Sequence, residues 1–112
     1  RYFGSGTYAG DEAGVDEERR ILTRENRLFI LRNTLLRNYL DIGSLSEAEK
    51  IINQNNPVSE SGAIHWEPRL EFFEIGQRYY EENDEPIQAA GFEEKYKQLI
   101  DQLELKGIEI NP

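Results

Sequence analysis

The sequence predicts an all-α domain of about four helices, arranged as a bundle or as stacked helical hairpins, with an irregular N-terminal arm. Two observations lead to this prediction. Apolar residues recur at intervals of three and four over most of residues 16–107, which is the period of an amphipathic helix. Residues typical of helix ends interrupt this pattern, and no long stretch alternates as a strand would. At 112 residues, the chain has the usual size of one domain with one hydrophobic core.

Residues 1–15 form the predicted flexible arm, because they follow neither a helical nor an alternating period. Three aromatic residues, Tyr2, Phe3 and Tyr8, lie there among small residues. One interpretation is a frayed chain end, which is common at termini. The other is that the three rings bind a neighbouring protein, because solvated tails rarely carry such large apolar side chains. The sequence leaves both interpretations open, with the three rings as candidate partner-binding residues.

The first helix of the predicted domain begins near Asp16, where a run of acids favours a helix N-terminus. At about 100° per residue, its apolar residues fall on two ridges. One ridge comprises Leu22, Phe29, Leu36 and Leu40, and the other comprises Ile21, Leu28, Leu31, Leu35 and Tyr39. Two ridges predict two packing partners, so we expect this helix to lie between others. Glu25 and Arg32 fall between the ridges, which predicts a buried polar seam in which Arg32 meets a carboxylate.

A helical hairpin is predicted next, because the first helix stops and a second one starts within a few residues. Gly43 suits the left-handed position that follows a helix, and Ser46 with Glu49 has the spacing of a capping box. The second helix then ends at Asn55, Asn56 and Pro57.

Proline marks the start of the third and fourth predicted helices. Pro68 and Pro86 each suit the first turn of a helix, where a missing N–H does no harm. The fourth helix carries apolar residues at spacings of four, three and four and stops at Gly107. Gly91 could separate its first turn. Residues 108–112 form a C-terminal tail, so the helical domain spans residues 16–107.

The net charge of −9 is unevenly distributed. Residues 1–18 carry −4, residues 19–40 carry +5 and residues 41–112 carry −10, so a cationic helix lies within an acidic chain. Four arginines gather on the polar side of this helix: Arg19, Arg20, Arg27 and Arg37. One interpretation is a docking face for an acidic protein segment or a nucleic-acid backbone, because arginine suits bidentate contacts with carboxylate and phosphate. The other is pairing within the domain with its acidic excess.

The sequence carries no recognisable catalytic or metal-binding motif. It has no cysteine, which excludes disulfides, thiolate nucleophiles and cysteine-ligated metals. The one histidine, His65, has no second ligand at a spacing typical of metal sites, so we expect it to pack beside Trp66 in a loop. We therefore expect no enzymatic activity, no cofactor and no metal.

The longest strictly apolar run, residues 28–31, is too short to cross a bilayer or to form the core of a signal peptide. We therefore expect a soluble chain without a membrane span. The absence of both cysteine and a signal peptide favours an intracellular location.

These observations predict a non-enzymatic protein–protein interaction module, acting as a scaffold or structural subunit of a larger assembly, with identical or different subunits as partners. The alternative is an acidic regulator that binds a basic partner, with its last two helices as a charge mimic of nucleic acid. A small hydrolase on paired carboxylates ranks third. Nucleic acid is an unfavourable partner, because an acidic chain repels phosphate. High salt would weaken a charge-driven regulator and leave an apolar contact nearly unchanged.

Overall fold

The computed structural model describes the backbone of residues 9–108 and the side chains of residues 24–108. Its elements are α1 (Ala9–Asp41), α2 (Leu45–Asn55), the 3₁₀ helix η2 (Asn56–Val58), α3 (Trp66–Glu82) and α4 (Pro86–Leu105). No strand occurs within residues 9–108. The predicted all-α fold with four helices is therefore confirmed.

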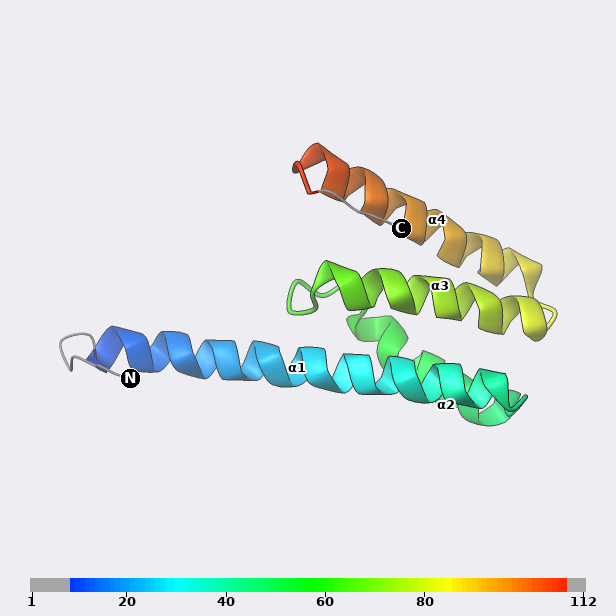
Figure 1. Ribbon diagram of the computed structural model, residues 1–112, viewed down its shortest axis with the longest axis horizontal. Helices are drawn as coiled ribbons and strands as arrows, with labels where there is room; N and C mark the ends of the chain where they lie inside the picture. Colours follow the sequence, from blue (N-terminus) through cyan, green and yellow to red (C-terminus); the bar gives the residue numbers. More distant parts are fainter. Residues whose placement is uncertain (1–8, 109–112) are drawn as a thin grey trace.

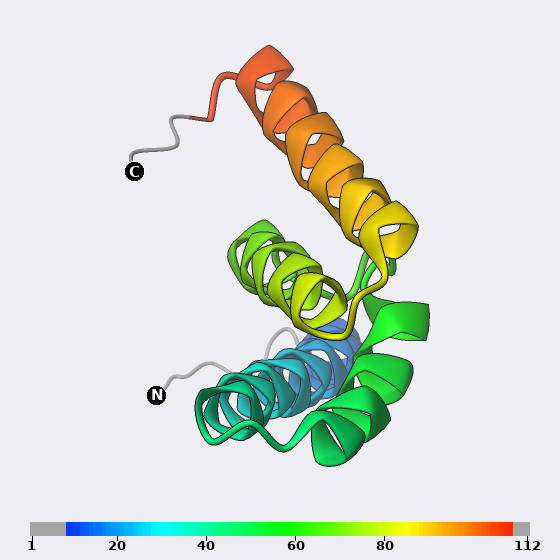
Figure 2. The same cartoon turned by 90° about the vertical axis from the view of Figure 1, so that its right-hand side faces the viewer.

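The helices form two stacked hairpins. Helices α1 and α2 make one antiparallel hairpin, and α3 and α4 make the other (Figure 1). Helix α3 is central, since it contacts α1, α2 and α4, whereas α4 contacts α3 alone among the elements of residues 9–108 (Figure 2). Of the two predicted arrangements, stacked hairpins describe the chain better than a closed bundle does.

Helix α1 begins at Ala9, ahead of the start predicted near Asp16. The acids at the predicted start are not the first in the chain, because Asp11 and Glu12 stand close to Ala9 and suit a helix N-terminus equally well. With 33 residues, α1 is the longest helix, and its first part extends beyond the other helices (Figure 1). The predicted anchors of the arm, Tyr2, Phe3 and Tyr8, lie outside the described residues.

Glycine ends two of the helices as predicted, and one predicted helix cap is wrong. Gly43 and Gly107 adopt φ values of +76° and +78°, the left-handed conformation that ends a helix. The predicted capping box at Ser46 and Glu49 is wrong, because α2 already begins at Leu45. Ser46 therefore lies inside the helix, where it cannot cap it. Helix α4 is continuous through Gly91.

Phenylalanine rings join the two hairpins in the core. Phe72 of α3 is fully buried, with its ring centroid 5.5 Å from that of Phe29 in α1 and 5.6 Å from that of Phe92 in α4. Helix α4 approaches α3 closely because Gly76 of α3 has no side chain. A Cβ at that position would overlap the Phe92 ring. The remaining core residues are Leu36, Leu40, Ala48, Ile51, Ile52, Ile64, Leu70, Phe73, Ile75, Tyr79, Leu99 and Leu103. The core thus leaves one face of α1 uncovered.

Candidate docking surface on helix α1

The inner face of α1 combines apolar residues with two buried asparagines. Phe29, Leu36 and Leu40 of the first predicted ridge are buried, as expected. Asn26 and Asn33 are buried beside them, being 8% and 0% exposed. These five residues recur at the spacing of a single helical stripe, so α1 turns one narrow face towards α2 and α3.

Each buried asparagine bonds to the backbone that precedes or opens α3. Asn33 donates from Nδ2 to the carbonyl oxygen of Pro68 at 3.0 Å and to Oε1 of Glu71 at 3.1 Å. Asn26 donates from Nδ2 to the carbonyl oxygen of Ala63 at 2.8 Å and accepts the backbone N–H of His65 at 2.7 Å. These bonds satisfy polar groups that would otherwise be costly to bury, and they fix α1 relative to α3.

The polar seam predicted at Glu25 and Arg32 is not present in this chain. Glu25 is exposed and Arg32 is half-buried, while the buried polar positions are Asn26 and Asn33. The first predicted ridge is thus buried, but the buried polar positions flank it on the side away from the second ridge. The short asparagine side chains bond to backbone carbonyls at the entry to α3, so the core avoids burying a charge.

The opposite face of α1 exposes leucines. Leu28, Leu31 and Leu35 are 42%, 61% and 45% exposed, and we call these three residues the outer stripe. They belong to the second predicted ridge, for which we expected a packing partner. No element among residues 9–108 covers them, and only Tyr39, at the end of that ridge, packs partly against the core.

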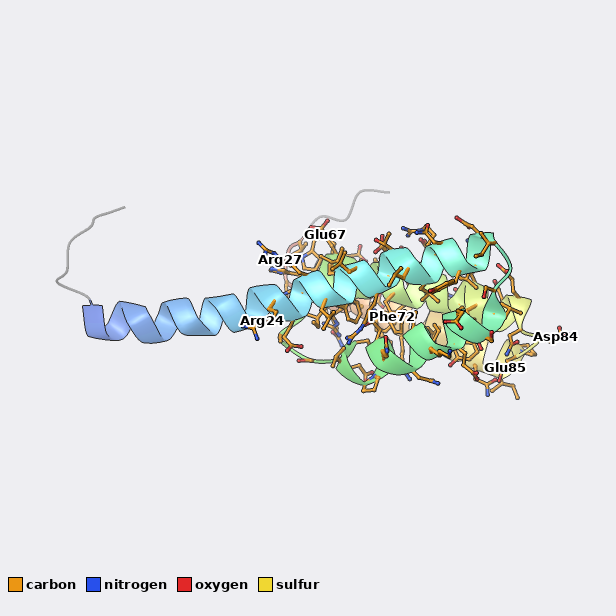
Figure 3. The ribbon with its side chains drawn as sticks, turned by 90° about the horizontal axis from the view of Figure 1, so that it is seen from below. Arg24, Arg27, Glu67, Phe72, Asp84 and Glu85 are labelled. Atoms are coloured by element: carbon orange, nitrogen blue, oxygen red, sulfur yellow. The ribbon has the colours of Figure 1, made fainter. Side chains whose placement is uncertain are left out.

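Three arginines border the outer stripe, and none of them forms an ion pair within residues 24–108. Arg24 and Arg27 are exposed where α1 leaves the stacked hairpins (Figure 3), and Arg32 is half-buried. None of the three makes an ion pair or a side-chain hydrogen bond with another described side chain. On the helical wheel, Arg27 and Arg32 lie on opposite edges of the stripe and Arg24 lies in line with it. Arg24 is not among the four arginines predicted to form a docking face.

The arginines elsewhere in the described chain behave differently. Arg37 donates from Nη2 to Oε2 of Glu71 at 3.1 Å, so the interpretation of internal pairing holds for this residue. Arg78 pairs with Asp41 at 2.9 Å and with Glu82 at 2.6 Å. The side chains of Arg19 and Arg20 lie outside the described ones. Of the four predicted docking arginines, the structure therefore describes only Arg27 as exposed and unpaired.

A second surface feature is an open groove between α1 and the start of α3. It encloses about 470 Å³ and is lined by Ile30, His65, Glu67, Pro68 and Glu71. His65 is exposed, and both carboxylate oxygens of Glu71 already accept hydrogen bonds from α1. Among the described side chains, no group of three or more His, Cys, Asp or Glu residues is placed to hold a metal ion. The groove therefore shows no arrangement that points to a particular reaction.

The described part of the chain is thus a pair of stacked helical hairpins, and within residues 24–108 a leucine stripe is uncovered and bordered by arginines without ion pairs. No helix within residues 9–108 is long and apolar enough to span a membrane. Compared with models of known protein families, with curated proteins and with solved structures, the chain matches none of them.

Proposed function

We propose that the protein is a non-enzymatic protein interaction module, acting as a scaffold or as a subunit of a larger assembly, and that a partner docks on the outer stripe of α1. The observation that carries this proposal is the exposure of three neighbouring leucines on one helix face. Full burial of a leucine side chain contributes roughly 1.5 to 3 kcal/mol, so covering this stripe offers a substantial gain to a partner. Contiguous exposed apolar surface is typical of interaction sites.

The shape of α1 supports the same proposal. Its N-terminal part extends past the other helices (Figures 1 and 3). A helix without tertiary contacts is only marginally stable in water, because propensity alone rarely offsets the cost of ordering the backbone. A partner on this helix would supply the missing contacts. The aromatic residues Tyr2, Phe3 and Tyr8 precede α1 and remain predicted anchors for the same partner.

The mass of the assembly that the chain forms in its source organism tests this proposal. Light scattering would compare the purified wild-type assembly with those of Leu31→Asp and of Leu105→Asp. Leu105 is a matched control, because this leucine is 89% exposed on α4, away from the stripe. We expect the wild type and the control to have a mass above that of one chain. Leu31→Asp should fall to the mass of a free chain and, as an isolated chain, melt at the same temperature as the isolated wild type. An unchanged mass for Leu31→Asp would contradict the proposal.

A further inference from the structure

We infer that the outer stripe binds an amphipathic helix of a partner protein whose apolar face is bordered by aspartate and glutamate side chains. This inference rests on the proposed docking function and adds the chemistry of the partner. It depends on the spacing of the leucines and on the lack of ion pairs, among the described side chains, at the arginines around them.

The spacing of the leucines favours a helical partner. Leu28, Leu31 and Leu35 follow one another at intervals of three and four residues. This is the pattern through which one helix packs against another, with each apolar side chain entering a gap between side chains of the facing helix. The backbone of α1 has its N–H and C=O groups paired within the helix, so it offers no edge to which a β-strand could add.

The arginines beside the stripe favour a partner helix with negative charge. Arg24, Arg27 and Arg32 lack ion pairs among the described side chains, although the chain as a whole carries a net charge of −9. Carboxylates are therefore abundant in the molecule, yet none of those on residues 24–108 forms an ion pair with these three guanidinium groups. Glutamate or aspartate at the border of a docked helix would meet Arg27 and Arg32 on opposite edges of the stripe. Arginine suits such contacts, because its planar group can bind a carboxylate through two hydrogen bonds.

A second copy of the chain fits the stripe less well. If two stripes met in an antiparallel contact centred on the leucines, each edge of the stripe would face the same edge of the other copy, so Arg32 of one copy would come close to Arg32 of the other. Like charges brought together in this way oppose association. The acidic partner helix instead gives each arginine an opposite charge.

Two designed helical peptides of about 20 residues test the inference. They share the same leucine positions, but one carries glutamate at the border positions and the other carries lysine. Fluorescence anisotropy would measure the affinity of each peptide for the whole chain. We expect the glutamate peptide to bind at least tenfold more tightly at low salt, and this difference should shrink at high salt because ions screen exposed charges.

Variants of the chain identify the site that produces this preference. The double variant Arg24→Glu/Arg27→Glu should reverse the preference, so that the lysine peptide binds more tightly. Leu31→Asp should abolish binding of both peptides. The control Lys97→Glu, an exposed position on α4, should leave the preference unchanged. The melting temperature of each variant should match that of the wild type, which shows that each variant is folded.

The outcomes separate this inference from the proposed function. If both peptides bind equally well and Leu31→Asp abolishes both, the acidic border is wrong while the docking stripe stands. If neither peptide binds but light scattering shows a dimer that Leu31→Asp dissociates, the inference is overturned and the stripe belongs to a second copy. Peptide binding that survives Leu31→Asp would overturn both the inference and the docking site of the proposed function. If neither peptide binds and the chain does not self-associate, the inference is overturned, and the mass of the natural assembly decides the proposed function.

Discussion

Asn55 of α2 donates from Nδ2 to Oδ1 of Asn33 in α1 at 3.0 Å, and neither side chain has any exposed surface. Asn33 donates in turn to Pro68 and Glu71 of α3. One buried hydrogen-bond network therefore joins three helices. Because only one alignment of the helices pairs these groups, the network specifies how α1 sits on its neighbours.

Replacing Asn33 by leucine should cost about 2 to 4 kcal/mol of unfolding free energy, because the change leaves the buried Asn55 amide with Phe29 as its one remaining partner. Urea unfolding measures this loss. Asn38→Leu is the matched control, since Asn38 is exposed on the same helix, and it should change stability by less than about 0.5 kcal/mol. A loss in Asn33→Leu no larger than that of the control would show that the network contributes nothing.

The contact between Gly76 and Phe92 predicts opposite effects for two glycine substitutions. Gly76→Ala should destabilise the chain by about 1 to 3 kcal/mol, because the new methyl group overlaps the Phe92 ring and forces α4 to shift. Gly91→Ala should be neutral or stabilise by up to about 1 kcal/mol, because this helical glycine has open space around it. Thermal unfolding of both variants checks the pair, and equal melting temperatures would contradict the packing described for α4.

The two faces of α1 should respond differently to the loss of a leucine. Leu36 is fully buried, so Leu36→Ala should cost about 2 to 5 kcal/mol. Leu31 belongs to the outer stripe, and Leu31→Ala should stay within about 0.5 kcal/mol of the wild type in the isolated chain. Urea unfolding of the isolated chain measures both values. A large loss for Leu31→Ala would mean that the outer stripe is already covered within the chain.

Two tyrosines at the end of α3 predict a loss of stability at alkaline pH. Burial raises the pKa of Tyr79 and of Tyr80, and the negative charges of Glu49 and Glu85 add to this effect. The folded chain therefore keeps these protons at a pH where the unfolded chain releases them. Their contribution to stability is fully present below the ordinary tyrosine pKa of about 10 and is lost as the pH rises through the raised values.

Urea unfolding between about pH 8 and about pH 11 checks this prediction. The unfolding midpoint should change little up to about pH 9 and then decrease. Tyr79→Phe/Tyr80→Phe keeps both rings and removes both phenolic groups, so this variant should lose less stability over the same range. If the variant and the wild type lose equal stability, other groups cause the alkaline loss.

Local signals in the sequence were sufficient to predict most of the fold. Glycine at 43 and 107 and proline at 68 and 86 mark helix ends, and each acts through its own backbone geometry, which depends little on the rest of the chain. The start of α1 was misplaced because acids occur both near residue 11 and near residue 16. Either group suits a helix N-terminus, so charge alone could not choose between them.

The orientation of α1 could not be predicted from its own residues. Its apolar positions cover more than half of the helical wheel, so two faces appeared equally suited to the core. The choice depends on partners distant in sequence, namely the carbonyl groups of Ala63 and Pro68 that accept the amides of Asn26 and Asn33. The absence of an ion pair at Arg24 within residues 24–108 could not be predicted either. Ion pairing depends on where the fold places the acidic residues of the other helices.

The measurement that most directly tests the docking role of α1 is amide hydrogen exchange, compared between the isolated chain and its natural assembly. Amides of a helix exchange when the helix opens locally, and a partner bound to the outer stripe suppresses this opening. We predict that assembly slows exchange at least tenfold in residues 24–35 and leaves the exposed faces of α3 and α4 nearly unchanged. Slower exchange confined to α3 and α4, with α1 unaffected, would contradict this account and favour an acidic regulator.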